Sequence, residues 1–594
     1  MKRHAASAVL GLSVFLGASA AAAHGGKVIS ELPCPVDEPM GMATDGESLF
    51  ISDMTTRTIV KVRPSDGTVI AKLEATGNTP TGLAWMSDTL FSADRNQDWI
   101  NRRKPTGGPD LSPIMYYEKW PAGLTSDGVA LWMVDVRDSK IHKIDPTDGT
   151  TVATFPAPAS APTGIAWDGR RLWVADHGTD EIYMVDRRDG TVNAILPAPG
   201  PYPNALAILN GAMWVADYQT RKLTQISLPD DTPYLEDQER RVHMSFEVTY
   251  RAKGKGKIVK LVSYLALPVD IPGQHVLGAF KFDPQPTRME TDKWGQKVAV
   301  FELGEVESRT PRRVRWEGDF ALYRVRFQMV PDRVDGAKMP ARMEAYLADD
   351  VKYDLDSPVV GDLVDKLTSD KRGTYDKARA LYEHLAKVIT YDRVGGWNNA
   401  ATVLKRGTGS CSEYTFALVA MLRKAGIPAR YVGAVSERGD EASFDDVFHR
   451  WAEAYMPGYG WVPLDANAAH GRPAGERAAF FGGRSNRHVV TTIGGGGSEQ
   501  LEWTYNSNEK YSAEGEVTLD IQPIARYRPL TGGPAAAPGK AARVLAPDLV
   551  EPEKSSAVRG KEGRLGDPWI AAIAVLLAIS LGYAAGHLSR RPAG

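Results

Sequence analysis

The sequence predicts a multidomain, mainly β-structured chain that opens with a ring of short strands. Five aspartates recur at a spacing of 41 residues, and each closes a short apolar run: Asp53, Asp94, Asp135, Asp176 and Asp217. Asp-Gly turns recur with the same period, for example at Asp148-Gly149. Short strands separated by tight turns at such a period are typical of a β-propeller. We therefore expect a five-bladed β-propeller over residues 25–232.

The first strand of the chain is expected to complete the last blade. The fifth repeat ends after Ser227 without its last strand, whereas Gly26–Leu32 matches Gly67–Leu73 at the same 41-residue step. Pairing between the N-terminal strand and the fifth repeat would close the ring and leave no exposed edge. The same alignment places Cys34 where other repeats have alanine, so we expect a small structural residue there and not a disulfide partner.

The recurring aspartates allow two interpretations. They could bind a ligand or a metal at one end of the ring, or they could cap the tight turns that follow each strand. Capping is the commoner role of aspartate at such positions. We therefore expect these residues to be structural.

Residues 240–350 are expected to form a β-rich, β-sandwich-like domain. Apolar and polar residues alternate in His243–Tyr250 and in Ala321–Val330, which is typical of half-buried antiparallel strands. The same alternation returns in Leu501–Tyr527, and these strands are expected to join either this domain or the α+β domain that precedes them.

An α+β domain is expected over residues 351–527. Apolar and small side chains recur at helical spacing from Cys411 to Leu422, which predicts a helix that begins at or near Cys411 and ends near Gly426. A helix start at that point would place the sulfur beside unsatisfied backbone N–H groups and the positive end of the helix dipole. Both favour the thiolate, so Cys411 is a candidate nucleophile.

Cys411, His449 and Asp465 follow one another in the order of a thiol nucleophile, its base and the carboxylate that orients the base. His449 lies in His-Arg-Trp-Ala-Glu, and Asp465 ends Gly-Trp-Val-Pro-Leu-Asp. His470 and His488 are rival bases. Both lie in glycine-rich or irregular stretches, for which surface loops are the simpler interpretation.

His449 and Asp465 can share a face only in one class of strand register. The loop Pro-Gly-Tyr-Gly joins their two strands, and alternate residues of a strand share a face. A pairing of Met456 with Trp461 would place Asp465 opposite Ala452, on the wrong face. In a register where the numbers of two paired residues add up to an even value, the two side chains lie on the same face. A sum of 914 places Asp465 directly opposite His449, and a sum of 916 places it diagonally. We therefore predict a loop of odd length or a bulge.

Four blocks in this part of the chain resemble the bacterial transglutaminase-like family, which has a papain-like core, and the resemblance extends over residues 350–500. The blocks are Gly-Ser-Cys-Ser-Glu-Tyr-Thr, Leu-Arg-Lys-Ala-Gly-Ile-Pro-Ala-Arg-Tyr-Val-Gly, His-x-Trp-x-Glu and Gly-Trp-Val-Pro-Leu-Asp. The resemblance implies that Cys411 is the nucleophile, His449 the base and Asp465 the third member of a triad. Three neighbours would support it: Ser410, Trp451 and Glu453. The family often continues with Asp-Pro-Thr, where this chain has Asp-Ala-Asn.

The N-terminal ring is similar to secreted β-propellers that share a Trp-Val-Ala-Asp strand. That superfamily has no common activity, so the resemblance implies a binding platform and no particular chemistry.

The two ends of the chain predict export and anchoring. Residues 1–23 combine basic residues, an apolar run and small residues, as in a signal peptide. Residues 528–567 have the composition of a flexible linker, residues 568–588 that of a transmembrane helix, and residues 589–594 would be a cytoplasmic tail. We expect an exported protein whose domains lie on the periplasmic or extracellular side; a buried terminal helix and a processed sorting tail are the alternatives for residues 568–588.

The composition argues against nucleic acid as a partner, because the net charge is −2 and the 24% of charged residues show no basic excess. Neither cysteine has a partner at metal-ligand spacing, so we expect no metal and no cofactor.

The expected function is that of an envelope-anchored cysteine acyl-transfer enzyme of transglutaminase-like type. Cys411 would attack a peptide or carboxamide carbonyl, and water or an amine would resolve the thioester. Hydrolysis would make the protein a protease or amidase, and amine transfer would make it a cross-linking enzyme. A protein or peptide substrate and an envelope partner held by the propeller are the expected partners. The alternatives are a non-catalytic envelope adaptor with an inactive core, and a propeller that is itself the catalyst.

Overall fold

The computed structural model describes residues 25–104, 110–116, 120–229, 232–307, 310–393 and 397–530. The predicted signal peptide at 1–23, the predicted membrane helix at 568–588 and the predicted tail at 589–594 lie outside these residues, as does almost all of the predicted linker.

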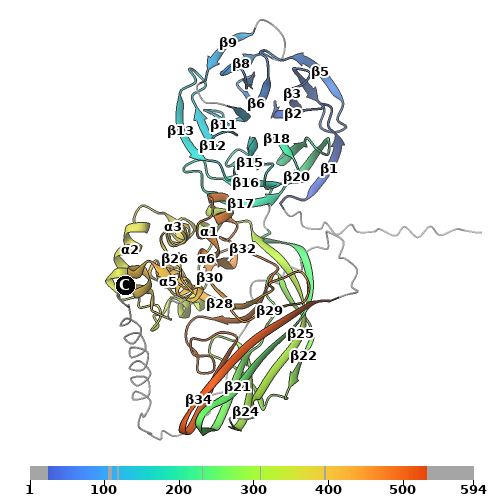
Figure 1. Ribbon diagram of the computed structural model, residues 1–594. Helices are drawn as coiled ribbons and strands as arrows, with labels where there is room; N and C mark the ends of the chain where they lie inside the picture. Colours follow the sequence, from blue (N-terminus) through green and yellow to red (C-terminus); the bar gives the residue numbers. More distant parts are fainter. Residues whose placement is uncertain are drawn as a thin grey trace, which may run out of the picture. The chain divides into compact units, whose positions relative to one another are not determined.

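Five four-stranded antiparallel sheets make up the described part of residues 28–227 (Figure 1). Their inner strands β2, β6, β10, β14 and β18 contact one another in turn, and β18 contacts β2, so the sheets form a closed ring. The strands, sheet by sheet, are β2 (Pro39–Thr44), β3 (Leu49–Asp53), β4 (Thr58–Val62) and β5 (Val69–Glu74); β6 (Pro80–Met86), β7 (Thr89–Asp94), β8 (Trp99–Arg103) and β9 (Leu111–Met115); β10 (Pro121–Ser126), β11 (Leu131–Asp135), β12 (Lys140–Ile144) and β13 (Thr151–Pro156); β14 (Pro162–Trp167), β15 (Leu172–Asp176), β16 (Glu181–Val185) and β17 (Val192–Pro197); β18 (Pro203–Leu209), β19 (Ala212–Asp217), β20 (Lys222–Ser227) and β1 (Val28–Pro33).

The ring closes through its first strand. β1 pairs antiparallel with β20, with Leu32 opposite Leu223, and so completes the fifth sheet. The predicted closure is therefore confirmed, and the N-terminal region is propeller-like. The Trp-Val-Ala-Asp repeat type stays a prediction.

The recurring aspartates cap turns. Asp53 Oδ1 accepts hydrogen bonds from the backbone N–H groups of Thr55 and Thr56 at 2.9 and 3.1 Å. The equivalent aspartates of the other four sheets bond the turn that follows them in the same way. The predicted structural role of these residues is confirmed.

A long strand organises the β-rich domain. β21 (Tyr234–Ala266) has 33 residues; its first half pairs with β25 (Arg312–Phe327) and its last part with β24 (Lys297–Val306). β34 (Ser507–Pro529) pairs with it almost throughout, so the C-terminal strands join this domain. The other strands of the sheet are β22 (Gln274–Asp283), β23 (Arg288–Thr291), β29 (Ser443–Asp445) and β32 (Gly483–Arg484).

This arrangement differs from the expected sandwich of two separate sheets. Because β21 is long enough to carry different partners along its length, the domain is built on one continuous eight-stranded sheet. Local alternation of polar and apolar residues predicts the strands correctly. It does not show with how many other strands a long strand will pair.

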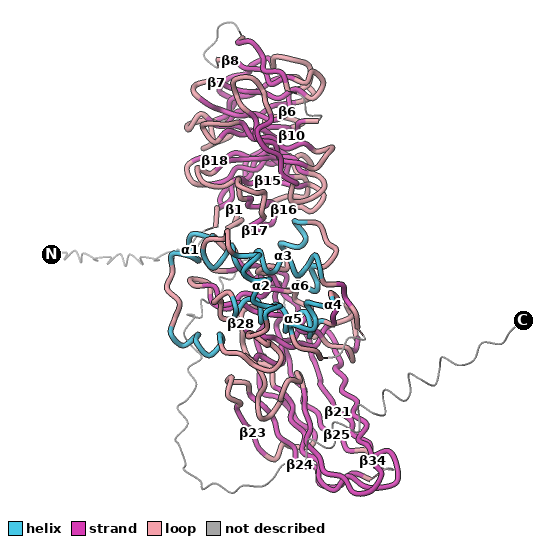
Figure 2. Tube along the Cα trace, turned by 90° about the vertical axis from the view of Figure 1, so that its left-hand side faces the viewer, coloured by secondary structure: helices cyan, strands magenta, loops and turns pink. Residues whose placement is uncertain are grey.

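The α+β domain packs its helices around a second sheet. That sheet has the order β31 (Gly460–Leu464), β30 (His449–Met456), β28 (Ala429–Ser436) and β33 (His488–Gly494). The helices, which Figure 2 shows gathered in this domain, are α1 (Pro331–Gly336), η1 (Ala341–Leu347), α2 (Pro358–Thr368), α3 (Gly373–Val388), α4 (Ala400–Arg406), α5 (Cys411–Lys424), α6 (Ala466–Ala469) and α7 (Ala474–Ala478). A short parallel pair consists of β26 (Thr390–Tyr391) and β27 (Thr408–Gly409).

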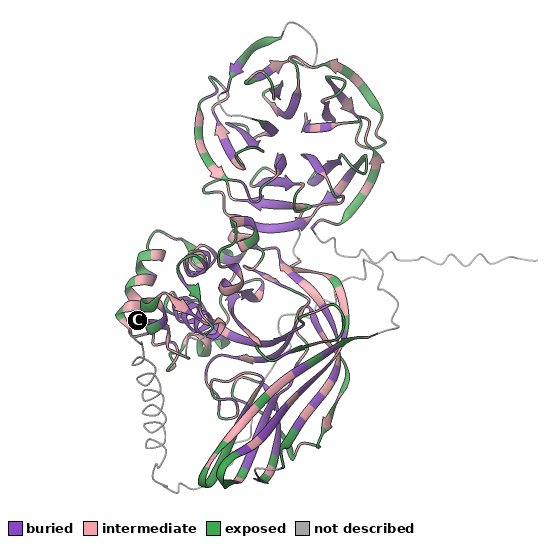
Figure 3. Ribbon diagram, in the orientation of Figure 1, coloured by how far each residue is buried: buried purple, intermediate pink, exposed green. Residues whose placement is uncertain are grey.

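Helix α5 is the centre of this domain's core. All of its residues from Ser412 to Arg423 are buried, and it contacts β30 and five of the other helices (Figure 3). This helix is buried on every side, and its apolar residues pack against the surrounding elements on all of its faces. The first residue of α5 is therefore held by the packing of the whole domain.

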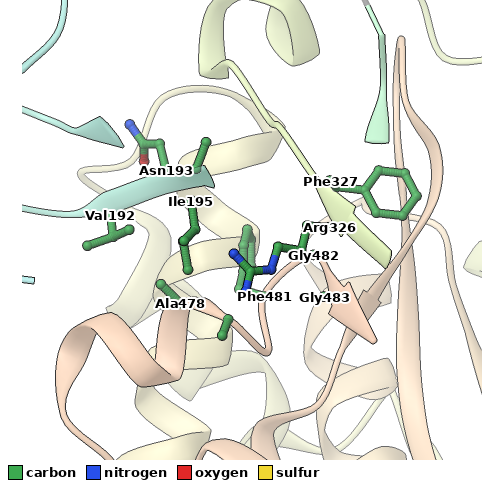
Figure 4. A pocket seen from close by; sticks show the side chains of 11 residues that line it. Val192, Asn193, Ile195, Arg326, Phe327, Ala478, Phe481, Gly482 and Gly483 are labelled. Atoms are coloured by element: carbon green, nitrogen blue, oxygen red, sulfur yellow. The ribbon is translucent and has the colours of Figure 1, made fainter. Parts of the chain in front are cut away.

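The propeller-like ring touches the α+β domain within the same compact unit. The Tyr375 hydroxyl donates to Asn193 Oδ1 at 2.9 Å, and Arg326 of β25, in the β-rich domain, forms an ion pair with Glu181 of the ring. Figure 4 shows the cavity at this contact, which has a volume of about 20 Å³. This space holds about one water molecule, so it is too small to be a ligand site.

The prediction of a transmembrane helix is corrected. Among the described residues, no helix is long and apolar enough to cross a membrane. The longest of them, α3, has 16 residues. At 1.5 Å per residue it measures about 24 Å, which is less than the thickness of about 30 Å of a bilayer's hydrocarbon core. This finding is at odds with the membrane anchor that the predicted fold class and localisation include.

Candidate active site

Cys411 is the first residue of α5, as the sequence predicts. Ser410 caps the helix: its Oγ accepts from the Glu413 N–H at 3.4 Å, and the Glu413 carboxylate accepts from the Ser410 N–H at 3.0 Å. This capping box fixes the backbone on both sides of the thiol. Glu413 also forms an ion pair with Arg406 at 3.0 Å, so its carboxylate is held away from the sulfur by several partners.

The strand register brings His449 and Asp465 together. Met456 pairs with Gly460, so paired residue numbers sum to 916, and the loop Pro457–Tyr459 has three residues. An even sum and a loop of odd length are what the face requirement predicts, and both are confirmed. His449 Nε2 lies 2.7 Å from Asp465 Oδ2.

The three side chains line one cavity, and His449 and the Cys411 thiol are close enough for each to shift the pKa of the other. Burial raises the pKa of Cys411, but the hydrogen bond and positive charge of His449, together with Arg450, bring it below its usual value. Burial lowers the pKa of His449, whereas Asp465 and Cys411 raise it to about 10. Burial raises the pKa of Asp465 and His449 lowers it more, so it is depressed. These directions favour a thiolate beside an imidazolium.

Asp465 has a second structural role. Its Oδ1 accepts from the Ala468 N–H at 2.9 Å and caps α6, and its own N–H donates to the Phe480 carbonyl at 3.0 Å. These bonds orient the carboxylate toward His449.

The two supporting residues predicted on β30 have different surroundings. The Trp451 ring centroid is 5.7 Å from that of His449, and its buried Nε1 has no hydrogen-bond partner among the described residues. Glu453 accepts from Arg430 on the neighbouring strand at 2.8 Å. Trp451 therefore borders the site, whereas Glu453 ties β30 to β28.

Arg450 is a residue that the sequence pattern did not single out. It is fully buried, and its guanidinium carbon lies 4.2–5.2 Å from the centroids of four aromatic rings: Trp397, Phe416, Tyr431 and Tyr505. Its Nη2 donates to the Trp503 carbonyl at 2.8 Å, while Nε and Nη1 have no hydrogen-bond partner among the described residues. A buried cation held by ring faces is positioned to stabilise the nearby thiolate.

Tyr505 also reaches the site from outside the recognised blocks. Its ring centroid lies 4.2 Å from the Arg450 guanidinium carbon, and burial and the charge of Cys411 raise its pKa. No local signal identifies Tyr505, because it lies 94 residues after the cysteine in an irregular segment.

The rival histidines differ from the surface loops expected for them. His488 begins β33, and its half-buried ring lies 5.7 Å from that of His449; its Nδ1 is 3.1 Å from Ser436 Oγ. Burial and the neighbouring charge of His449 lower the pKa of His488 to about 3, so it stays neutral. His470 Nδ1 bonds the Ala386 carbonyl at 3.0 Å. His488 therefore belongs to the site. Its position there follows from the pairing of β33 with β28, which places His488 opposite Ser436.

The triad opens onto a cavity of about 400 Å³. Its lining includes the three triad side chains together with Tyr391, Phe448, Trp451, Phe480, Arg438, Arg487 and His488. A volume of this size accommodates one extended side chain with its carbonyl group. Among the described residues there is no group of three or more His, Cys, Asp or Glu side chains that could hold a metal.

The other cysteine has a different environment. Cys34 packs beside Leu32 at the edge of an apolar cluster, and burial raises its pKa to about 11. Both cysteines are unpaired thiols. Cys34 is therefore the small structural residue that the repeat predicts.

Comparisons with known proteins place this site in a family. Residues 361–466 match the model of the transglutaminase-like superfamily. The uncharacterized protein YebA of Bacillus subtilis (strain 168) is 30% identical over 132 residues, which are 18% of this chain and 17% of that protein. The chain thus covers about a sixth of that relative.

Two solved structures show more distant likeness. A putative cysteine protease from Cytophaga hutchinsonii is 14% identical with a TM-score of 0.35, covering 50% of this chain and all of that one. The glutaminyl cyclase of Myxococcus xanthus is 15% identical with a TM-score of 0.31, covering 34% of this chain and 96% of that one. These TM-scores are too low to carry an argument about the activity.

The family match covers the start of α5 with its cysteine, the strand with its histidine and the aspartate that ends β31. Residues 361–466 of this chain are therefore a transglutaminase-like domain, which places the site in a general family of cysteine enzymes.

Proposed function

We propose that this domain catalyses acyl transfer through a thioester on Cys411. The sulfur attacks the carbonyl carbon of a peptide or carboxamide. The observation that carries this proposal is the position of Cys411 at the start of a buried helix, in one cavity with His449 and with the Asp465 carboxylate that lies 2.7 Å from His449. The transglutaminase-like match is consistent with it.

In the first half of the reaction, the thiolate sulfur forms a bond to the carbonyl carbon. The developing oxyanion would be held by the N–H groups in the first turn of α5, which have no carbonyl partner within the helix. As the C–N bond breaks, His449 donates its proton to the leaving amine or ammonia. Asp465 holds the imidazole in the orientation that allows both steps.

In the second half, water or an amine attacks the thioester and gives its proton to His449. The C–S bond breaks, and the Cys411 thiolate is restored. Water yields a carboxylic acid and an amine yields a new amide. The propeller would serve as the platform that binds a substrate or a partner protein.

The thiol chemistry is tested by alkylation of the full chain with iodoacetamide over a pH series, followed by peptide mass spectrometry. Cys411 is expected to react rapidly near neutral pH. In His449→Ala the thiol stays buried but loses its ion pair, so the reaction should need a higher pH. Cys34, whose pKa is about 11, is an internal control and should stay unlabelled near neutral pH.

The acyl transfer is tested with benzyloxycarbonyl-glutaminylglycine and with casein, each with and without glycine methyl ester. Ammonia release, new peptide ends or amide formation would identify amidase, protease or cross-linking activity, and a thioester adduct on Cys411 should be seen by mass spectrometry. Slow labelling that does not depend on His449, with no adduct on either substrate, would contradict the proposal and favour the non-catalytic adaptor.

A further inference from the structure

One end of the propeller-like ring carries a set of equivalent residues from all five sheets. In each sheet, the residue after the recurring aspartate donates its N–H to the carbonyl of the residue just before the inner strand, at 3.0–3.3 Å. The five pairs are Met54 and Glu38, Arg95 and Thr79, Val136 and Trp120, His177 and Ala161, and Tyr218 and Tyr202. Since the sheets surround one axis, these pairs encircle that axis at one end (Figure 1).

Five of these ten side chains are aromatic or basic, and their contacts form two groups. The rings of His177 and Tyr202 stack with centroids 4.3 Å apart, and those of Tyr202 and Tyr218 are 5.5 Å apart. The Arg95 guanidinium lies 5.8 Å from the Trp120 ring. We call these five residues the ring-end cluster.

The ring-end cluster draws its residues from several sheets of the ring. Arg95 belongs to the sheet of β6–β9, and Tyr202 precedes β18 of a sheet that is not its neighbour. Burial lowers the pKa of Arg95, and Tyr202 acts on it in the opposite direction.

Two polar atoms of the cluster are left without partners. Arg95 Nε and His177 Nδ1 are buried, and neither has a hydrogen-bond partner among the described residues. Buried polar atoms are nearly always paired, so such atoms at one spot need an explanation. Nearby, Trp120 and Tyr218 are 48% and 41% exposed, which is unusual for large aromatic side chains that have a core available.

We propose that the ring-end cluster binds a carboxylate that is attached to an aromatic or similarly apolar group. The guanidinium of Arg95 would pair with the carboxylate, and His177 would supply a further hydrogen bond. The faces of Trp120, Tyr202 and Tyr218 would cover the apolar part. A single guanidinium suits one negative charge better than a phosphate, which carries more. This binding does not depend on the chemistry at Cys411.

The test uses the full chain and saturation-transfer NMR with N-acetylphenylalanine. Its amide, which lacks the carboxylate, and N-acetylalanine, which lacks the ring, should both bind about tenfold more weakly or not at all. A tripeptide Ala-Ala-Phe with a free carboxyl end distinguishes the two sources of the ligand: preference for the tripeptide identifies a peptide end, and preference for the acetylated amino acid identifies a small molecule.

Variants locate the binding. Arg95→Gln should weaken it about tenfold, and Tyr218→Ala, at an exposed position where the fold is not at stake, should also weaken it. Arg137→Gln removes an exposed arginine from the next sheet's turn and should leave binding unchanged. Equal binding of the acid and its amide, unchanged binding in both cluster variants, or equal weakening by Arg137→Gln would overturn the proposal.

Discussion

His449 Nε2 lies 2.7 Å from Asp465 Oδ2 because β30 and β31 pair in an even register. The two strands belong to one hairpin, and the hairpin's three-residue loop sets that register. A loop longer or shorter by one residue would turn the Asp465 side chain to the opposite face. The contact between base and carboxylate is therefore decided by the length of a loop.

Insertion of glycine into this loop tests that relationship. One glycine between Gly458 and Tyr459 should separate His449 from Asp465, and alkylation of Cys411 should then need a higher pH. Two inserted glycines disturb the loop at least as much but restore the even register, so they should return the low-pH reaction. If both insertions had the same effect, loop length would not control the contact.

Asp465→Asn should keep the fold and remove most of the activity. The amide can still cap α6, but it no longer favours the charged imidazole, so the His449 pKa should fall from about 10. By analogy with other triads, turnover of a scissile substrate should drop about a thousandfold or more. The loss is measured as kcat, with the thermal unfolding midpoint as a control; an unchanged kcat would show that Asp465 is only a structural residue.

Arg450→Met should raise the pKa of the Cys411 thiol, because a cation that favours the thiolate is lost. The measurement is the midpoint of the alkylation rate against pH. Arg450→Lys retains the charge among the same rings and should keep most of the reactivity. Identical midpoints in the Met and Lys variants would indicate that Arg450 acts by packing alone.

Glu509→Gln should stabilise the protein above neutral pH. Burial, with the nearby charge of Glu502, raises the pKa of Glu509 from 4.5 to about 7. The folded state therefore binds more protons than the unfolded state in this interval, so the free energy of unfolding falls as the pH rises from about 4.5 to 7. Removal of the charge should restore about 2–3 kcal/mol at pH 8 and almost nothing at pH 4.

That stability difference is measured by denaturant unfolding at the two pH values. Glu516→Gln, on the exposed part of the same strand, is the matched control and should have little effect at either pH. A gain at pH 4 as large as that at pH 8 would show that the titration of Glu509 is not its origin.

Some features of the tertiary structure could be predicted because they depend on spacings and motifs within short stretches of the sequence. The 41-residue repeat determines the number of sheets and the closing strand, since each repeat must bury its strands against the next one. The start of α5 at Cys411 is marked by the cap of Ser410 and Glu413. The parity of the hairpin follows from the requirement that His449 and Asp465 share a face.

Other features depended on segments far apart in the chain. β21 was predicted as strands, but its pairing with β34 joins residues that are more than 240 positions apart. His488 was assigned to a surface loop because nothing near it shows that β33 will pair with β28. The composition of residues 568–588, which lie outside the described residues, predicts a membrane helix. Among the described residues, no helix is long and apolar enough to cross a membrane.

By itself, the sequence determined the repeat, the helix start and the parity of the hairpin, because each depends on spacing along the chain. Only the tertiary structure decided what surrounds the sulfur: the ring faces around Arg450, the hydroxyl of Tyr505 and the neutral ring of His488. These groups are brought to Cys411 by packing and strand pairing between distant segments, and neither leaves a periodic signal in the sequence.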